Sequence, residues 1–203
     1  MTEIEKEVEQ VSKIMKIIIL GSSEVGKTCI LNRYFHNEFQ DNLLSTIGID
    51  FQTKFFRFEN EKIKVNYIDT AGQEKFRAIS VNYLKGTDGV ILVFDITKRE
   101  TFDLLESWLK ELKDTNKGDV SKVLIGNKSD LAEERKVTFE EANNLAQIMK
   151  CTYYEASAKT GENITEALDE IARIAFIDSS NREERVDSIV LNREEKKKKR
   201  KCC

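Results

Sequence analysis

Short hydrophobic runs, separated by longer amphipathic stretches, predict a chain that alternates strands and helices. Continuous apolar runs at 15–20, 89–95 and 122–126 are typical of strands buried on both faces. Alternating segments at 49–58 and 62–68 flank a polar Glu-Asn-Glu turn and predict a hairpin. The other predicted elements are helices at 27–38, 101–114, 138–149 and 163–177 and a strand at 152–156. This order indicates an α/β fold with a mostly parallel sheet covered on both faces.

The same pattern divides the 203 residues into one domain and two polar ends. Residues 1–13 are polar and acidic, and we expect a flexible arm. Residues 14–177 carry the periodic segments and form the domain. From 178 to 203 the periodicity is lost, so a flexible tail is predicted, with the basic run 196–201 and a terminal cysteine pair. No apolar run approaches the ~20 residues that a membrane helix needs.

Charge is distributed unevenly along the chain. The net charge is −3, although the run 196–201 alone contributes +6, so the rest of the chain carries −9. This argues against nucleic-acid binding over a broad surface and favours attraction of the tail to an anionic surface. The four cysteines are few and scattered, and the acidic start lacks the basic region of a secretory signal. We therefore expect a reduced, cytosol-facing protein.

A glycine-rich loop follows the first predicted strand. The segment Gly21-Ser-Ser-Glu-Val-Gly26-Lys27-Thr28 matches G-x-x-x-x-G-K-[ST] between a strand and a helix. Backbone N–H groups of such a loop and the helix N-terminus bind phosphates. Lys27 is expected to reach the β- and γ-phosphates, and the Thr28 hydroxyl to ligate Mg²⁺. A glycine turn with an incidental lysine is the alternative, and the flanking elements count against it. The motif predicts a nucleoside triphosphate without choosing the base.

Two polar segments after later strands predict which base is bound. Asn127-Lys-Ser-Asp130 follows the strand at 122–126, and Ser157-Ala-Lys159 follows the strand at 152–156. Ligands of parallel sheets bind at these carboxyl ends. The Asp130 carboxylate can accept hydrogen bonds from the ring N–H and the exocyclic amine of guanine, whereas adenine presents an acceptor there. A polar turn is the alternative for this short motif, but its pairing with the phosphate loop predicts a guanine nucleotide.

With these motifs the chain resembles a small GTPase of the Ras superfamily. The segment 69–74 (Asp-Thr-Ala-Gly-Gln-Glu) resembles the metal- and water-positioning segment of that family. Three features resemble the Rab branch: Ser-Thr-Ile-Gly-Ile-Asp-Phe at 45–51, Lys-Phe-Arg at 75–77, and the terminal cysteine pair. The resemblance covers residues 14–177 and the last two residues. It implies a three-layer P-loop GTPase fold, with a six-stranded, mostly parallel sheet and about five helices.

The resemblance also implies roles for individual residues. The phosphate-binding positions would be Ser23, Glu24, Val25, Gly26, Lys27, Thr28, Cys29, Thr46 and Gly72. The metal ligands would be Thr28, Thr46 and, through water, Asp69. The guanine-binding positions would be Phe39, Asn127, Lys128, Asp130, Ser157, Ala158 and Lys159, with a plain core role as the alternative for Phe39. The effector surface would comprise Ile47, Gly48, Ile49, Asp50, Phe51, Ile68 and Tyr83. Gln73 would orient the attacking water, with a solvated loop glutamine as the alternative.

The activity implied is slow hydrolysis of GTP to GDP and phosphate, with Mg²⁺ as cofactor. The phosphate loop contains no arginine, so a GTPase-activating protein would supply one. The other implied partners are an exchange factor, effectors, a prenylation escort and a GDP-dissociation inhibitor. Cys202 and Cys203 would carry geranylgeranyl groups that anchor a monomer to the cytoplasmic face of intracellular membranes, with a cytosolic pool. Free thiols and a solvated basic run without a partner are the alternatives.

Two positions depart from the family pattern, and two other functions remain open. Glu24 stands where the family usually has a small residue, so its charge predicts faster GDP release than in Glu24→Gly unless a cation intervenes. A side chain pointing into solvent is the alternative. Ile68 stands where Rab proteins usually have Trp.

A small-molecule kinase would need an acceptor pocket and an arginine lid, and neither is found. A nucleotide-free or nucleotide-locked scaffold is favoured only by Glu24.

Overall fold

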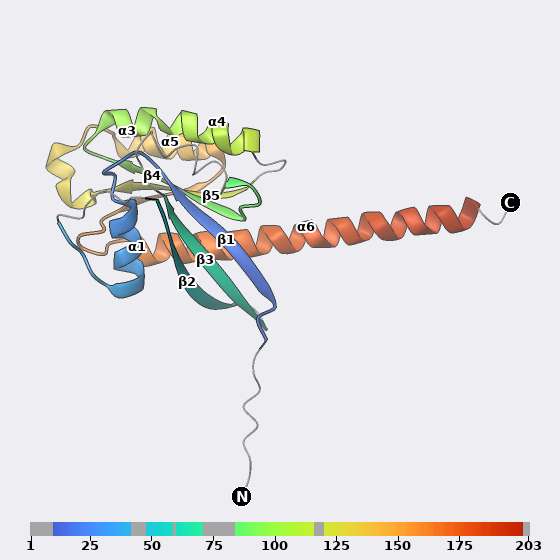
Figure 1. Ribbon diagram of the computed structural model, residues 1–203. Helices are drawn as coiled ribbons and strands as arrows, with labels where there is room; N and C mark the ends of the chain where they lie inside the picture. The colour runs from blue at the N-terminus through green and yellow to red at the C-terminus, as the bar shows by residue number, and fades with distance from the viewer. Residues whose placement is uncertain (1–9, 42–47, 59, 71–83, 116–119, 201–203) are drawn as a thin grey trace, which may run out of the picture.

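A six-stranded sheet in the order β2-β3-β1-β4-β5-β6 forms the middle layer of the protein (Figure 1). The structure is a computed structural model that describes residues 10–41, 48–58, 60–70, 84–115 and 120–200, with side chains up to Arg182. The strands are β1 (Lys13–Leu20), β2 (Ile49–Phe58), β3 (Glu61–Thr70), β4 (Gly89–Asp95), β5 (Ser121–Asn127) and β6 (Thr152–Ala156). Among these described strands, only the β2–β3 pairing is antiparallel, which confirms the predicted hairpin and the mostly parallel sheet.

Helices cover both faces of this sheet. The described helices are α1 (Lys27–His36), α3 (Arg99–Asp103), α4 (Leu105–Thr115), α5 (Phe139–Met149) and α6 (Ile164–Arg200), with a 3₁₀ turn, η2 (Ser129–Glu134). On one face, Ile30 of α1 and Leu168 of α6 pack into one core cluster. On the other face, Leu105 of α4 and Ala142 of α5 pack into a second core cluster. The predicted three-layer α/β fold, with five described α-helices, is confirmed.

The two core clusters explain the apolar runs in the sequence. All seven residues of β4 are buried, because one set of side chains faces α1 and α6 and the other faces α4 and α5. A strand covered on both faces has no solvent side, so it does not alternate. The parallel strands place their carboxyl ends along one edge, where the candidate motifs lie.

One predicted helix is wrong. The single helix expected at 101–114 is two helices that meet at Leu104. The Leu104 carbonyl accepts hydrogen bonds from the Ser107 hydroxyl at 2.7 Å and from the Ser107 N–H at 3.1 Å. This local turn competes with the i to i+4 helical bond and separates α3 from α4.

The expected end of the last helix is also wrong. A helix over 163–177 and a flexible tail from 178 were predicted, but α6 continues to Arg200 and projects away from the sheet (Figure 1). Residues 178–200 contain no Gly or Pro and many Glu, Arg and Lys, which have high helix propensity. Helix can therefore continue without an apolar stripe. Among the described helices, none has the length and hydropathy required to cross a bilayer.

Most of the predicted acidic arm lies outside the described residues. At its end, the Ser12 N–H donates to the Lys62 carbonyl at 2.9 Å, and its hydroxyl donates to Glu61 at 3.1 Å. Strand β1 begins at Lys13, two residues before the predicted start, and the chain is tied to β3 there. Ser12 and Lys13, which the sequence pattern placed in the arm, are therefore attached to the sheet.

Candidate nucleotide-binding site

The loop between β1 and α1 is shaped by two glycines. A Cβ on Gly21 would lie 2.2 Å from the Val93 carbonyl oxygen, so no side chain fits there. Gly26 has φ 94, and a Cβ on it would lie 2.3 Å from Nδ2 of Asn127. The loop can therefore approach β4 and β5 closely only with glycine at both positions.

Lys27 is the buried cation of this loop. Its side chain is 5% exposed, and Nζ donates to the carbonyls of Gly21 and Ser22 at 2.8 Å each. Burial lowers the pKa of Lys27 to about 8, and the nearby Asp69 carboxylate partly opposes this shift. Because the ammonium is held mainly by neutral carbonyls, phosphate oxygens would stabilise its charge further. This is the role that the motif predicts.

Thr28 and Asp69 form the part of the site that fits a magnesium ion. The Thr28 hydroxyl donates to Oδ2 of Asp69 at 2.6 Å. Oδ1 of Asp69 is buried and has no hydrogen-bond partner in the described part of the chain. Burial raises the pKa of Asp69, whereas the Thr28 hydrogen bond and Lys27 lower it. A buried, unpaired carboxylate oxygen beside a hydroxyl matches the oxygen ligands of Mg²⁺.

The wider ligand set of this magnesium position is small. Within the described ranges, no group of three or more His, Cys, Asp or Glu side chains is placed to hold a metal. Mg²⁺ usually keeps several waters and needs only one or two carboxylates, so one Asp and one Thr agree with it. The third predicted ligand, Thr46, lies outside the described residues.

Asn127 joins the phosphate loop to the base loop. This residue ends β5 and is 2% exposed. Its Nδ2 donates to the Val25 carbonyl at 2.7 Å, and its Oδ1 accepts from the Ala158 N–H at 3.1 Å. One amide side chain therefore fixes two separate segments of the predicted site, and both of its polar ends are paired.

Asp130 is held in place by the loop after β6. The buried Ser157 hydroxyl donates to Oδ1 of Asp130 at 2.6 Å and accepts from the Thr160 N–H at 3.1 Å. Asp130 itself is exposed, at the start of η2. The carboxylate is thus oriented by one neighbour while remaining open to a ligand, as recognition of guanine requires.

The other predicted contacts of the base differ in their burial and in their partners. Lys128 has φ 71, and its Nζ lies 2.6 Å from Oδ2 of the buried Asp95. Lys159 is exposed, whereas the neighbouring Ala158 is buried. Phe39 is half-buried and packs against the core cluster on the α1 side.

Arg33 is a part of the site that the motifs did not include. From α1, its Nε donates to the Ala158 carbonyl at 2.9 Å, and Nη2 donates to the Lys159 carbonyl at 2.7 Å. These bonds hold the base loop from α1, whereas Asn127 holds it from the end of β5. No spacing in the sequence indicates this contact, because it depends on how α1 packs against the loop after β6.

The structure describes only some of the remaining predicted site residues. Ser23 and Cys29 are half-buried in and just after the phosphate loop, Val25 is fully buried, and Glu24 is exposed. Burial raises the pKa of the Cys29 thiol. The predicted residues outside the described ranges are Thr46, Ile47, Gly72, Gln73, Tyr83, Cys202 and Cys203.

The predicted effector surface lies on the edge strand β2. Asp50 is exposed, Phe51 is 54% exposed, and Ile49 is half-buried. Ile68 lies opposite Phe51 in β3, but it is only 2% exposed and belongs to the core cluster on the α4 side. Ile68 therefore packs in the core next to this surface and contributes little exposed area to it.

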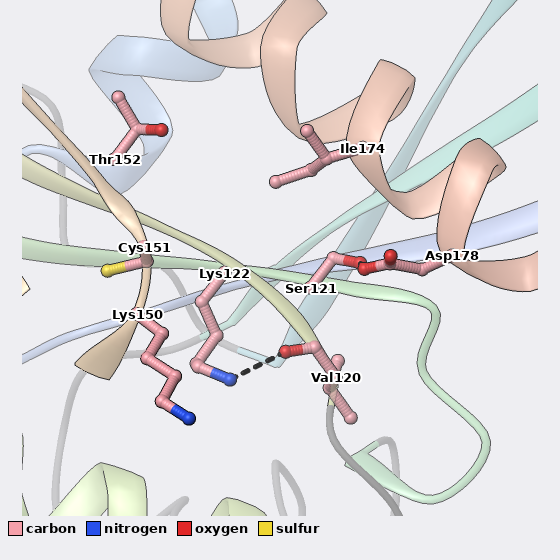
Figure 2. Close-up of a pocket in the computed structure, with 8 residues that line it drawn as sticks. All are labelled: Val120, Ser121, Lys122, Lys150, Cys151, Thr152, Ile174 and Asp178. Atoms are coloured by element: carbon pink, nitrogen blue, oxygen red, sulfur yellow. Dashed lines mark hydrogen bonds between the residues drawn. The ribbon is translucent and has the colours of Figure 1, made fainter.

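A separate cavity of about 350 Å³ lies at the other end of the strands (Figure 2). Its lining residues are Val120, Ser121, Lys122, Lys150, Cys151, Thr152, Ile174 and Asp178. The Ser121 hydroxyl donates to Asp178 of α6 at 2.5 Å, and Lys122 Nζ donates to the Val120 carbonyl at 2.8 Å. Burial raises the pKa of Cys151 to about 11, so this thiol stays protonated at neutral pH. The cavity contains none of the predicted nucleotide-binding residues.

The carboxyl edge of the sheet is built to receive a nucleoside phosphate, and the fold around it defines a P-loop nucleotide-binding protein. Comparison with known proteins narrows this class. The Ras family model matches residues 16–176. Rab-13 of Bos taurus is 39% identical over 169 residues, which are 83% of each chain. Rab-4 of Dictyostelium discoideum is 42% identical over 75% of each chain, and Rab-1 of Theileria parva is 42% identical over 79% of this chain and 73% of its own. The chain belongs to the Ras family of small GTPases, in the Rab branch.

Proposed function

We propose that this protein is a Rab-type molecular switch that binds and hydrolyses GTP and, in its GTP form, recruits effectors to a cytosolic membrane face in vesicle trafficking. The observation that carries the proposal is the convergence of Lys27 and Asp130 at one edge of the sheet. Lys27 is a buried cation suited to phosphate, and Asp130 is an exposed carboxylate oriented by Ser157. Asn127 connects the two halves.

Hydrolysis in this site would depend on positioning and charge, not on a strong base. Lys27 would stabilise negative charge on the β- and γ-phosphates. Thr28 and Asp69, with Thr46, would hold Mg²⁺, which neutralises phosphate charge when bound. Gln73 would orient the attacking water, and the Gly72 N–H would contact the γ-phosphate. Because the loop at 21–28 has no arginine, intrinsic turnover would be slow until a GTPase-activating protein supplies one.

The nucleotide state would change the surface near the edge strand β2, and the lipidated tail would hold the protein at the membrane. The segments around Thr46 and Gly72 would change order when the γ-phosphate leaves, which changes the surface beside Phe51. Lipid groups on Cys202 and Cys203, together with the basic run 196–201, would give stable anchoring. An exchange factor, a prenylation escort and a GDP-dissociation inhibitor complete the partners of this cycle, and the protein would act as a monomer without binding nucleic acid.

A scaffold of the same fold, empty or locked on one nucleotide, is the second candidate. Glu24 favours it, because a carboxylate in a phosphate loop repels the ligand. The intact Thr28–Asp69 pair counts against the empty form, since a protein that binds no nucleotide has no need of a metal position.

The bound nucleotide tests the proposal. We would purify the full chain with Mg²⁺, denature it, and identify and quantify the released nucleotide. We expect about one equivalent of GDP, following the single-site pattern of the motif. Adenine nucleotide would overturn the base assignment, and a folded protein without nucleotide would support the scaffold.

A matched pair of variants makes this test specific. In Asp130→Asn, an amide N–H faces the two donors of guanine, so GDP affinity should fall by at least ~100-fold. Asp114→Asn, at an exposed position of α4, should retain GDP as the unchanged protein does. Equal retention by both variants would contradict the assigned role of Asp130.

A further inference from the structure

Glu24 is an unusual member of the phosphate loop. It is a charged, non-glycine residue with φ 64, in the left-handed region that glycine adopts most easily. Its side chain is 71% exposed, so the carboxylate points out of the loop and not into the space beneath it. The predicted phosphate-binding loop therefore carries a negative charge. The effect of this charge on a bound phosphate depends on where the Glu24 carboxylate points.

Lys98 holds that carboxylate. Nζ of Lys98 lies 2.9 Å from Oε2 of Glu24. Lys98 belongs to the turn between β4 and α3, which is 74 residues away in sequence. No motif predicted this pair, although the charge of Glu24 was expected to weaken nucleotide binding unless a cation intervenes.

The backbone that presents Lys98 is firmly bonded. The Lys98 N–H donates to the Asp95 carbonyl at 3.0 Å, and the Lys98 carbonyl accepts from the Thr101 hydroxyl at 2.7 Å. The same hydroxyl accepts from the Asp95 N–H at 3.0 Å. These hydrogen bonds fix the backbone of Lys98. The ion pair with Glu24 therefore connects the phosphate loop to the end of β4.

A second ion pair lies beside the first. Asp95, at the end of β4, is paired with Lys128 at 2.6 Å, and Lys128 belongs to the guanine-selective segment. The hydrogen bond from Lys98 is the main cause of the lowered pKa of Glu24, and Lys128 adds to it. The corresponding bond from Glu24 is the main cause of the raised pKa of Lys98. Each carboxylate here therefore has its own lysine.

We propose that Lys98 is a positioning residue of the nucleotide site, which holds the Glu24 carboxylate away from the nucleotide phosphates and thereby slows GDP release. This inference rests on the proposed function, since it concerns the retention of GDP. Without Lys98, the carboxylate can turn toward the phosphates, and like charges would repel across the loop. With Lys98 in place, the penalty expected for Glu24 is largely cancelled.

The pair should matter for nucleotide retention more than for folding. Both side chains are partly exposed, and exposed ion pairs contribute little to stability. A purely structural role would change the melting temperature, whereas the proposed role changes the GDP dissociation rate. These two readouts separate the possibilities.

The test uses the full-length, Mg²⁺-loaded protein charged with fluorescent N-methylanthraniloyl GDP and chased with excess GDP. In Lys98→Met, release should be about threefold to tenfold faster than in the unchanged protein, at low salt. The acceleration should shrink in 1 M salt, where charges separated by more than ~3 Å are screened. Lys110→Met, at an exposed position of α4, should release GDP at the unchanged rate.

The decisive comparison is the double variant. In a Glu24→Gly background there is no carboxylate to hold, so Lys98→Met should leave the release rate unchanged. Equal acceleration in both backgrounds, or none in either, would overturn the pairing. Lys98→Gln gives a second substitution if Lys98→Met unfolds. If the unchanged protein retains no GDP at all, the proposed function fails; if it does but Lys98 has no effect, only this inference fails.

Discussion

At the scale of single residues, Asn127 shows how much of the site depends on one side chain. Its amide is buried, with the donor paired to Val25 and the acceptor paired to Ala158. A residue at this place must donate on one side and accept on the other, and Asn does both. The position of the phosphate loop and of the base loop is therefore coupled through one planar group.

Gly126, the residue before Asn127, has no space for a side chain, and this predicts the effect of a substitution on stability. A Cβ on Gly126 would lie 2.5 Å from the Tyr153 hydroxyl oxygen and 2.9 Å from Cζ of Phe94. Gly126→Ala should therefore lower the free energy of unfolding by about 1–3 kcal/mol through overpacking. Urea unfolding of the GDP-loaded protein measures this change.

The control removes the nearest obstacle. Tyr153→Phe deletes the hydroxyl oxygen, so the double variant should recover part of the stability lost in Gly126→Ala. The Phe94 ring remains in the way, and recovery should be incomplete. A double variant no more stable than expected from adding the two single effects would show that the Tyr153 hydroxyl is not the limiting contact.

Residues in contiguous motifs could be predicted, whereas their supports could not. Lys27 and Asp130 lie in segments whose spacing fixes their chemistry before folding. Arg33 and Lys98 contact the same site but come from α1 and from the turn after β4, where nothing in the local sequence distinguishes them from surface cations. Their partners are set by tertiary packing, which a single sequence does not show.

At the scale of elements, the buried strands were predictable and the helix limits were not. The β4 segment is seven residues long and apolar nearly throughout, which is typical of a buried strand and short for a helix. The end of a helix depends on weaker local competition. The Ser107–Leu104 hydrogen bond lies where α4 follows α3. Past residue 177, α6 has residues of high helix propensity and the hydrogen bond between Ser121 and Asp178.

The start of α5 gives a prediction on pH. Glu141 accepts from the Thr138 N–H at 3.0 Å while its own N–H donates to the Thr138 hydroxyl at 3.2 Å, which forms a capping box. The Arg99 guanidinium, 2.6 Å away, is the main cause that lowers the pKa of Glu141 from 4.5 to about 2. A lowered carboxyl pKa stabilises the fold above pH 4.5, and this contribution is lost as pH falls toward 2.

Glu141→Gln should therefore unfold at lower urea concentration than the unchanged protein at pH 7. The difference between the two midpoints should shrink as pH falls below 4.5 and be small near pH 2, provided both remain folded without urea. Glu140→Gln, at the exposed neighbouring position of the same turn, serves as the control and should show a smaller difference. A difference for Glu141→Gln that stays constant from pH 7 to 3 would contradict the ionic origin of the effect.

At the scale of the whole molecule, the length of α6 is the main departure from what the sequence predicted. A proline inside the outer part of this helix removes a backbone donor and costs about 3 kcal/mol in helix propensity. Ser188→Pro should therefore reduce the helical circular dichroism signal at 222 nm, while GDP binding by the domain is unchanged. Ser188→Ala should keep or raise the signal. If both variants match the unchanged protein, residues beyond 182 are coil in solution.

A helical tail has an electrostatic consequence that a coil does not share. The 18 residues beyond Arg182 extend about 27 Å at the helical rise, which is roughly three Debye lengths at physiological ionic strength. Residues 1–182 carry a net charge of −6 and would be repelled by an anionic leaflet at close range. If the tail is anchored as proposed, a helical rod would hold them where the field of the leaflet has decayed. The domain would then meet its partners at a height above the membrane where lipid charge neither attracts nor repels them.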